Sequence, residues 1–282
     1  MQAIREAKNY KVKESFLIHF LEKYWFIPSD VLQRGVEANI WDLCSFKKPI
    51  LDIGIGNGQM SNFIFKNSPQ IDVGIDLEEG GLESARKTNK YIKVLQANAE
   101  NMPFKNASFN SVVSNSTFEH IVNDLKAISE VSRVLEKGGL FFTTIPSGYL
   151  QKWILEYEKV KNKAKSQENL RIFNKRANHL HYRSLANWKK IFRDNSLKLV
   201  FHKYYFPKKT ALFWYKLFKI FTYKLHGREM WSIIVNSRIT KFIPKDLVIK
   251  YLKNMLLKNV YEKGFFVNSG NGAQLFMIVR KI

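Results

Sequence analysis

The chain contains a single cysteine, Cys44, among its 282 residues. One cysteine cannot form an intrachain disulfide, and it excludes a metal or redox site built on a CxxC pair. No run of 18 uninterrupted apolar residues occurs, so a membrane-spanning helix is not expected. The N-terminal segment also lacks the apolar core and cleavage pattern of a signal peptide. Together these absences predict a cytoplasmic protein.

The second half of the chain has few acidic residues. Residues 1–150 hold 17 lysines and arginines against 17 acidic residues, whereas residues 151–282 hold 29 against 7. The whole net charge of +22 therefore belongs to the second half. A lysine-rich source proteome is one explanation, but that bias would act on both halves alike. We therefore expect an anionic partner for this half: a membrane surface, a phosphorylated lipid or nucleic acid.

Apolar residues are abundant: they make up 45% of the chain and are arranged in short runs. Strands are predicted at residues 50–53, 71–75, 91–95, 111–114, 140–145, 197–206 and 274–279. Helices are predicted between them, at residues 58–67, 79–88, 122–135, 151–176 and 184–194. This alternation indicates an α/β, Rossmann-like doubly wound parallel sheet of about seven strands.

Three regions are predicted along the chain. Residues 1–47 form an N-terminal helical lid of two amphipathic helices, which a proline at position 28 separates. Residues 48–206 and 269–282 form the Rossmann-like core. Residues 207–268, rich in lysine and aromatic residues, form a helical insertion before the last strand.

A glycine-rich loop follows the first predicted strand, where residues 51–58 read L-D-I-G-I-G-N-G. Glycine allows unusual backbone angles and lets a ligand approach bare backbone, and the helix N-terminus after it favours an anion. Asp76 comes 20 residues after Gly56, where a carboxylate can accept both hydroxyl groups of a ribose. The dinucleotide fingerprint G-x-G-x-x-G would need a further glycine where this chain has Gln59. A dinucleotide site and a purely structural turn are the weaker alternatives.

Three more segments follow in order: Q-A-N-A-E-N-M-P-F at 96–104, S-N-S-T-F-E-H at 114–120 and R-V-L-E-K-G-G at 133–139. With the glycine loop they resemble the class I S-adenosylmethionine-dependent methyltransferases of type 11, the ubiquinone/menaquinone methyltransferase type. The resemblance covers roughly residues 48–146. It implies that S-adenosylmethionine is the cofactor and that the chain is a methyltransferase.

The resemblance also implies a set of cofactor-binding residues. Gly54 and Gly56 would hold the methionine moiety and Asp76 the ribose, while Leu77 would pack against the adenine. The implied set is Asp52, Gly54, Gly56, Asn57, Gly58, Asp76, Leu77, Asn98, Ala99 and Asn115. Asn98 departs from a common aspartate, but its carbonyl oxygen can still accept a hydrogen bond from the adenine amino group.

No catalytic residue is obvious, because methyl transfer needs mainly proximity and alignment, and a base only where an acceptor proton must leave early. His120 is the first candidate, since its loop faces the methyl group in the resembling family; ordering the next helix is the alternative. His181, or its neighbours His179 and Tyr182, could line the acceptor pocket or simply pack. No metal site is predicted at the two histidines, because no acidic partner is evident from the sequence.

Residues 207–225 predict a helix with an aromatic, apolar arc and a lysine face. Such a helix suits the plane of a membrane surface, and an ordinary helix packed on the core is the alternative. We therefore expect a small-molecule or lipid- or glycan-linked acceptor, with the protein peripheral at the inner face of the membrane. An RNA methyltransferase is the competing hypothesis, and a scaffold with a relic cofactor fold is the third. Nucleic acid is disfavoured because the S-N-S-T loop differs from the N-P-P-Y type of amino-methyltransferases.

Overall fold

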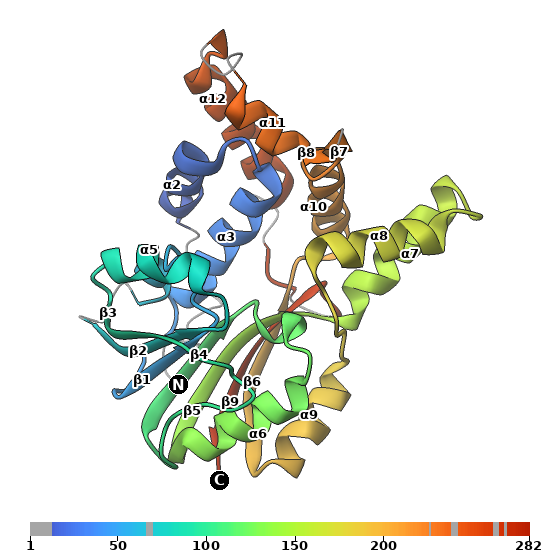
Figure 1. Ribbon diagram of the computed structural model, residues 1–282. Helices are drawn as coiled ribbons and strands as arrows, with labels where there is room; N and C mark the ends of the chain where they lie inside the picture. The colour runs from blue at the N-terminus through green and yellow to red at the C-terminus, as the bar shows by residue number, and fades with distance from the viewer. Residues whose placement is uncertain (1–12, 66–69, 226, 238–241, 262–264, 268–269) are drawn as a thin grey trace.

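The computed structural model describes residues 13–65, 70–225, 227–237, 242–261, 265–267 and 270–282. At its centre is a seven-stranded sheet in the order β3-β2-β1-β4-β5-β9-β6 (Figure 1). The strands are β1 (Ile50–Ile53), β2 (Ile71–Asp76), β3 (Tyr91–Gln96), β4 (Phe109–Asn115), β5 (Leu135–Pro146), β6 (Leu197–Tyr205) and β9 (Gln274–Lys281). This arrangement confirms the predicted Rossmann-like α/β fold.

One strand departs from the expected parallel sheet. Strands β1 to β5 pair in parallel, but β9 is antiparallel to both of its neighbours, β5 and β6. A strand's direction depends on the side from which the chain returns to the sheet. Here the chain returns from the helices that follow β6, and the apolar pattern of residues 274–279 carries no sign of that direction.

Short helices connect the parallel strands: α4 (Ser61–Ile64), η2 (Glu79–Gly81), α5 (Leu82–Lys87), η3 (Phe118–His120), α6 (Asp124–Val134) and α9 (Leu185–Asp194). Helices α6 and α9 lie against the sheet (Figure 1). The side chains of Asn123 and Ser184 accept hydrogen bonds from backbone N–H groups in the first turns of α6 and α9. The helix predicted at 58–67 is shorter, because turns occupy the residues before Ser61 and the helix ends at Ile64; residues 66 and 67 lie outside the described residues.

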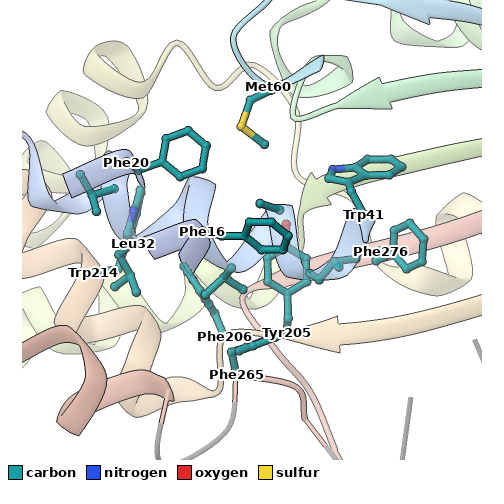
Figure 2. Packing of buried hydrophobic residues seen from close by; sticks show 14 of the residues in the cluster. Phe16, Phe20, Leu32, Trp41, Met60, Tyr205, Phe206, Trp214, Phe265 and Phe276 are labelled. Carbon is teal, nitrogen blue, oxygen red and sulfur yellow. The ribbon is translucent and has the colours of Figure 1, made fainter. Parts of the chain in front are cut away.

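Five helices gather at one end of the sheet, and we call them the helical layer (Figure 1). They are α2 (Glu14–Tyr24), α3 (Pro28–Trp41), α10 (Lys208–Phe221), α11 (Met230–Asn236) and α12 (Lys245–Leu256). Helix α3 packs against α2 and α10, and α12 packs against α2. Phe20, Leu32 and Trp214 belong to one buried cluster with Tyr205 and Phe206 at the end of β6 (Figure 2). The predicted lid and insertion therefore share a core although they lie far apart in the sequence.

The helical stretch predicted at 151–176 forms two helices. Helix α7 (Gly148–Lys161) and helix α8 (Ser166–Ala177) pack against each other. A turn separates them, in which the Asn162 side chain accepts a hydrogen bond from the backbone N–H of Lys165 at 3.2 Å. Asn is suited to such a turn because its side chain competes with the helical hydrogen bonds.

Helix α10 also differs from its prediction over 207–225, since it ends at Phe221. The next residues form a small hairpin, β7 (Lys224–Leu225) with β8 (Arg228–Glu229). The apolar arc of α10 faces protein: Trp214, Leu217 and Phe218 are buried. Packing on the core therefore accounts for these three residues, whereas Ile220 of the same arc is 56% exposed. Within the described ranges, no helix is both long and apolar enough to cross a membrane.

Candidate functional site

The three glycines in the loop between β1 and α4 have two different structural roles. Gly54, Gly56 and Gly58 have φ angles of 78°, 50° and 75°, which side-chain-bearing residues rarely adopt. A Cβ atom on Gly54 would clash with the Thr117 side chain, and one on Gly58 would lie 2.8 Å from the Cα of Ala85. A Cβ atom on Gly56 would meet no described atom within 4 Å. Gly54 and Gly58 thus serve packing, while the space beside the Cα atom of Gly56 is open to a ligand.

Asp76, at the end of β2, stabilises this loop. Its Oδ2 atom accepts a hydrogen bond from the backbone N–H of Gly56 at 2.8 Å, and Oδ1 accepts one from Glu78 N at 3.0 Å. A carboxylate keeps further lone pairs after these two bonds, so it can still accept from ribose hydroxyl groups. The side chain of Leu77 is 62% exposed beside it, as a surface for an adenine ring would be.

Asn98 orders the turn after β3, next to Asp76. Its side-chain oxygen accepts a hydrogen bond from the backbone N–H of Glu100 at 2.8 Å, and Ala97 N donates to the carbonyl oxygen of Asp76 at 2.9 Å. Ala99 is buried in the same turn. The residues that the sequence assigns to ribose and adenine therefore meet at the ends of two neighbouring strands.

Asp52 lies under the loop and is buried. The hydroxyl group of Tyr91 donates a hydrogen bond to its Oδ2 atom at 2.6 Å. Burial raises the pKa of the Asp52 carboxyl group to about 7, although the bond from Tyr91 opposes the rise.

A cavity of about 510 Å³ runs from the glycine loop to the helical layer. Of the residues singled out from the sequence, Asp52, Gly54, Gly56, Asn57, Asn115, His120 and His179 line it. Gly58, Asp76, Leu77, Asn98 and Ala99 are not among its described lining residues. Gly58 lies within the glycine loop, and the other four lie at or just after the ends of β2 and β3. Helices α3 and α10 contribute Arg34, Glu37, Trp214 and Phe218 to the opposite side. One cavity therefore joins the loop to side chains of the helical layer.

The sequence did not reveal Glu37, a buried carboxyl group on α3. Asn115 donates to its Oε2 atom at 3.0 Å, and Ser116 and Tyr205 donate to its Oε1 atom at 2.9 and 3.2 Å. Burial raises the pKa of Glu37, against the effect of the hydrogen bonds from Gln33, Asn115 and Ser116. The network joins the helical layer to the end of β4 and holds the side chain of Asn115. Its only signal in the sequence is an acidic residue within the apolar stripe of α3.

His120 lies in the cavity wall. Its Nδ1 atom donates a hydrogen bond to the carbonyl oxygen of Asn178 at 2.7 Å, because a carbonyl oxygen can only accept. Its ring centroid lies 5.5 Å from that of His179, which lines the same cavity. The location suits the predicted role near an acceptor, which stays a prediction.

His181 points elsewhere. Its Nε2 atom donates to the carbonyl oxygens of Ile121 and Val122 at 2.9 and 3.1 Å. It is not among the described residues that line the cavity. These bonds hold the segment around His181 against the loop after η3. His179 lines the cavity in its place.

Glu119 is the acidic neighbour that the sequence did not show for the histidines. It is buried, and its Oε2 atom has no hydrogen-bond partner among the described residues. Burial raises its pKa to about 8. Burial, with a smaller contribution from His120, lowers the pKa of His179 to about 3, so that its ring is neutral. Glu119 and His179 are 60 residues apart in the sequence, so no local sequence pattern predicts that they are neighbours.

Comparisons with known proteins agree with the loop geometry. A family model described as a methyltransferase domain, type 11, matches residues 51–143. An uncharacterized protein of Methanocaldococcus jannaschii is 35% identical over 165 residues, which cover 56% of this chain and 60% of the relative. The ubiquinone/menaquinone biosynthesis C-methyltransferase of Wigglesworthia glossinidia brevipalpis is 28% identical over 150 residues, 48% of this chain and 60% of that protein. Among the first relatives, the chain spans between 44% and 60% of their length.

A solved S-adenosylmethionine-dependent methyltransferase from Thermotoga maritima has the same fold. It superposes with a TM-score of 0.53 over 94% of this chain and 100% of that one, at 18% identity. At this level of identity the likeness concerns the fold alone.

Proposed function

We propose that this chain, which belongs to the class I S-adenosylmethionine-dependent methyltransferases of type 11, methylates a small-molecule or lipid-linked acceptor. The observation that carries the proposal is the single cavity that both the glycine loop and the helical layer line. A transferase of this kind must bring donor and acceptor within about 3–3.5 Å of each other and in line. One cavity with a donor end and a separate side-chain-rich end meets that need.

The chemistry divides between the two ends of the cavity. S-adenosylmethionine, when bound, supplies a methyl group on a sulfonium. Gly56 and Asp76 would hold this donor, since the space beside the Cα atom of Gly56 is open and the Asp76 carboxylate keeps free lone pairs. Trp214 and Phe218 add aromatic surface to the cavity wall on the side of the helical layer. His120 and Glu119 line the same cavity and would face a bound acceptor.

The cavity lining favours a polar acceptor without many phosphates. Three carboxyl groups line it near the helical layer, those of Asp30, Glu37 and Glu119, against the guanidinium groups of Arg34 and Arg176. Neither an ionised nor a protonated carboxyl group offers the cationic contact that a nucleic-acid backbone prefers. We therefore place the small-molecule or lipid-linked acceptor ahead of RNA.

Labelled methyl transfer tests the proposal. The purified chain is incubated with methyl-labelled S-adenosylmethionine and with separated polar-metabolite, lipid and RNA fractions of cell extract. We expect label in the polar or lipid fraction and none in RNA. Label in RNA alone would support the competing RNA methyltransferase, and label in none of the fractions, with the donor bound, would support a scaffold.

For the proposed anionic membrane partner, α12 is a better candidate than α10. Leu247 and Tyr251 are 65% and 69% exposed, and they lie four residues apart on one helical face. Phe242, 85% exposed, precedes them, and Lys245 and Lys250 are exposed on the same helix. Exposed aromatic residues beside lysines favour an anionic lipid surface.

Vesicle sedimentation tests this partner. We expect binding to phosphatidylglycerol vesicles at low salt, and loss of binding in a Leu247→Ser, Tyr251→Ser double variant. Ile220→Ser, at an exposed position of α10, is the matched control and should bind like the parent. Equal sedimentation of all three proteins would refute the role of α12.

A further inference from the structure

Three potential metal ligands come together in the cavity wall. One ligand atom from each of Glu119, His120 and His179 lies within 4.8 Å of the other two. Ligand atoms bound to one ion at about 2.0–2.2 Å are at most about 4.4 Å apart. A cation could therefore be bound after a small inward movement of these side chains.

The backbone holds the two segments of this cluster together. The N–H of Leu180 donates to the carbonyl oxygen of Glu119 at 2.8 Å, and the ring of His120 donates to the carbonyl oxygen of Asn178 at 2.7 Å. Asn178 itself ends α8 in the left-handed conformation, with φ 53°. The turn at Asn178 thus places His179 beside η3 independently of any ligand.

Neighbouring groups fix both histidines in the form that a metal needs. The hydroxyl group of Tyr182 donates to Asn174 at 2.9 Å, so its oxygen accepts a hydrogen bond from Nδ1 of His179 at 2.8 Å. Nδ1 of His120 carries its proton toward Asn178. Each ring therefore keeps an Nε2 lone pair that these bonds do not use. Metal-binding histidines are typically oriented in this way, with the other nitrogen donating to an oxygen.

Glu119 supplies the oxygen ligand. Glu119 is 4% exposed, and its Oε2 atom has no hydrogen-bond partner among the described residues. A buried oxygen without a partner is costly, and binding of a cation would remove that cost.

From these contacts we propose that Glu119, His120 and His179 form a divalent transition-metal site in the cavity. Two imidazoles and one carboxylate suit Zn²⁺, Mn²⁺, Fe²⁺ or Co²⁺, whereas Mg²⁺ and Ca²⁺ prefer oxygen ligands. Three protein ligands leave coordination positions open. Because all three residues line the same cavity as the glycine loop, the open positions are available to an acceptor.

The role of the metal toward the acceptor rests on the proposed function. A metal-bound hydroxyl group of the acceptor loses its proton more readily. Its proton passes to water, its oxygen forms the bond to the methyl carbon, and the electron pair of the broken carbon–sulfur bond stays on sulfur. The site therefore indicates a hydroxyl-bearing acceptor and O-methylation.

Cobalt spectroscopy tests the metal site without any need for activity. Tag-free, chelator-treated full chain is titrated with Co²⁺, and the visible d–d absorption is followed and then displaced with Zn²⁺. We expect saturation at one Co²⁺ per chain. Glu119→Gln and His179→Gln should each weaken Co²⁺ binding by at least about tenfold, as lost ligands do. His120→Gln, at a more exposed position, provides a third variant in case a buried substitution prevents folding, which circular dichroism would reveal.

His181→Gln is the matched control, because this histidine lies two residues from His179 but bonds to backbone carbonyl oxygens. It should bind Co²⁺ like the parent. No absorption band with the parent, or equal weakening by His181→Gln and His179→Gln, would overturn the proposal. Calorimetry with S-adenosylhomocysteine on the same samples separates the two hypotheses: its failure would refute donor binding and leave the metal site intact.

Discussion

The donor end of the cavity and the helical layer are built in different ways. At the donor end, backbone groups and strand ends form the site, within a stretch of the chain whose charges balance. In the helical layer, side chains from α3 and α10 form it, and the two helices are separated by more than 160 residues. A backbone site depends on a short local pattern, whereas a side-chain site depends on packing. Substitutions should therefore affect donor binding less and less from the loop toward the helical layer.

The largest effect is expected at Gly54. Gly54→Ala would force a side chain against Thr117 at a φ of 78°. Overpacking and the unfavourable angle together should cost about 3 kcal/mol of stability. Affinity for S-adenosylhomocysteine should fall by about 100-fold or more, close to 3 kcal/mol of binding free energy. Calorimetry and thermal unfolding measure the two losses; near-parental affinity would show that the loop does not hold the donor.

Gly56→Ala should come second. Its new methyl group meets no described atom within 4 Å, so the cost in stability should be limited to about 1–2 kcal/mol from the φ angle. The methyl group would enter the space through which the donor approaches, and affinity should fall by about tenfold. Gly138→Ala is the matched control, with φ 83° and equally open surroundings. Gly138→Ala should lose as much stability as Gly56→Ala but keep its affinity for S-adenosylhomocysteine.

Glu37→Gln tests the connection between the two regions. The carboxyl group accepts hydrogen bonds from Asn115, Ser116 and Tyr205, and an amide would put N–H groups against these donors. We expect a stability loss of about 1–3 kcal/mol and a few-fold loss of donor affinity through Asn115. Tyr205→Phe removes one of the donors only, so its effect on affinity should be smaller. A larger loss of donor affinity in Tyr205→Phe than in Glu37→Gln would contradict the role assigned to the hydrogen-bond network of Glu37.

Trp214→Ala should have the smallest effect on donor binding. The indole is buried on α10, and its loss should cost about 3–5 kcal/mol of stability. Affinity for S-adenosylhomocysteine, measured where the variant stays folded, should stay within about twofold of the parent, while methyl transfer falls. A loss of affinity as large as that of Gly56→Ala would remove the distinction between the two regions.

The same contrast explains how much the sequence could predict. Residues 51–58 form the end of β1 and the loop after it, so their glycines and Asp76, 20 residues after Gly56, could be recognised from spacing alone. The cluster of Glu119 and His179 could not, because it depends on how α8 ends against η3. The antiparallel direction of β9 and the end of α10 at Phe221 likewise depend on where distant segments pack.

Calorimetric titration of the purified chain with S-adenosylmethionine tests the central claim most directly. The account predicts saturable binding at one site per chain, which S-adenosylhomocysteine abolishes by competition and which Gly56→Ala weakens but Gly138→Ala does not. A correctly folded chain that gives no saturable heat, or one in which both alanine variants bind alike, would contradict it.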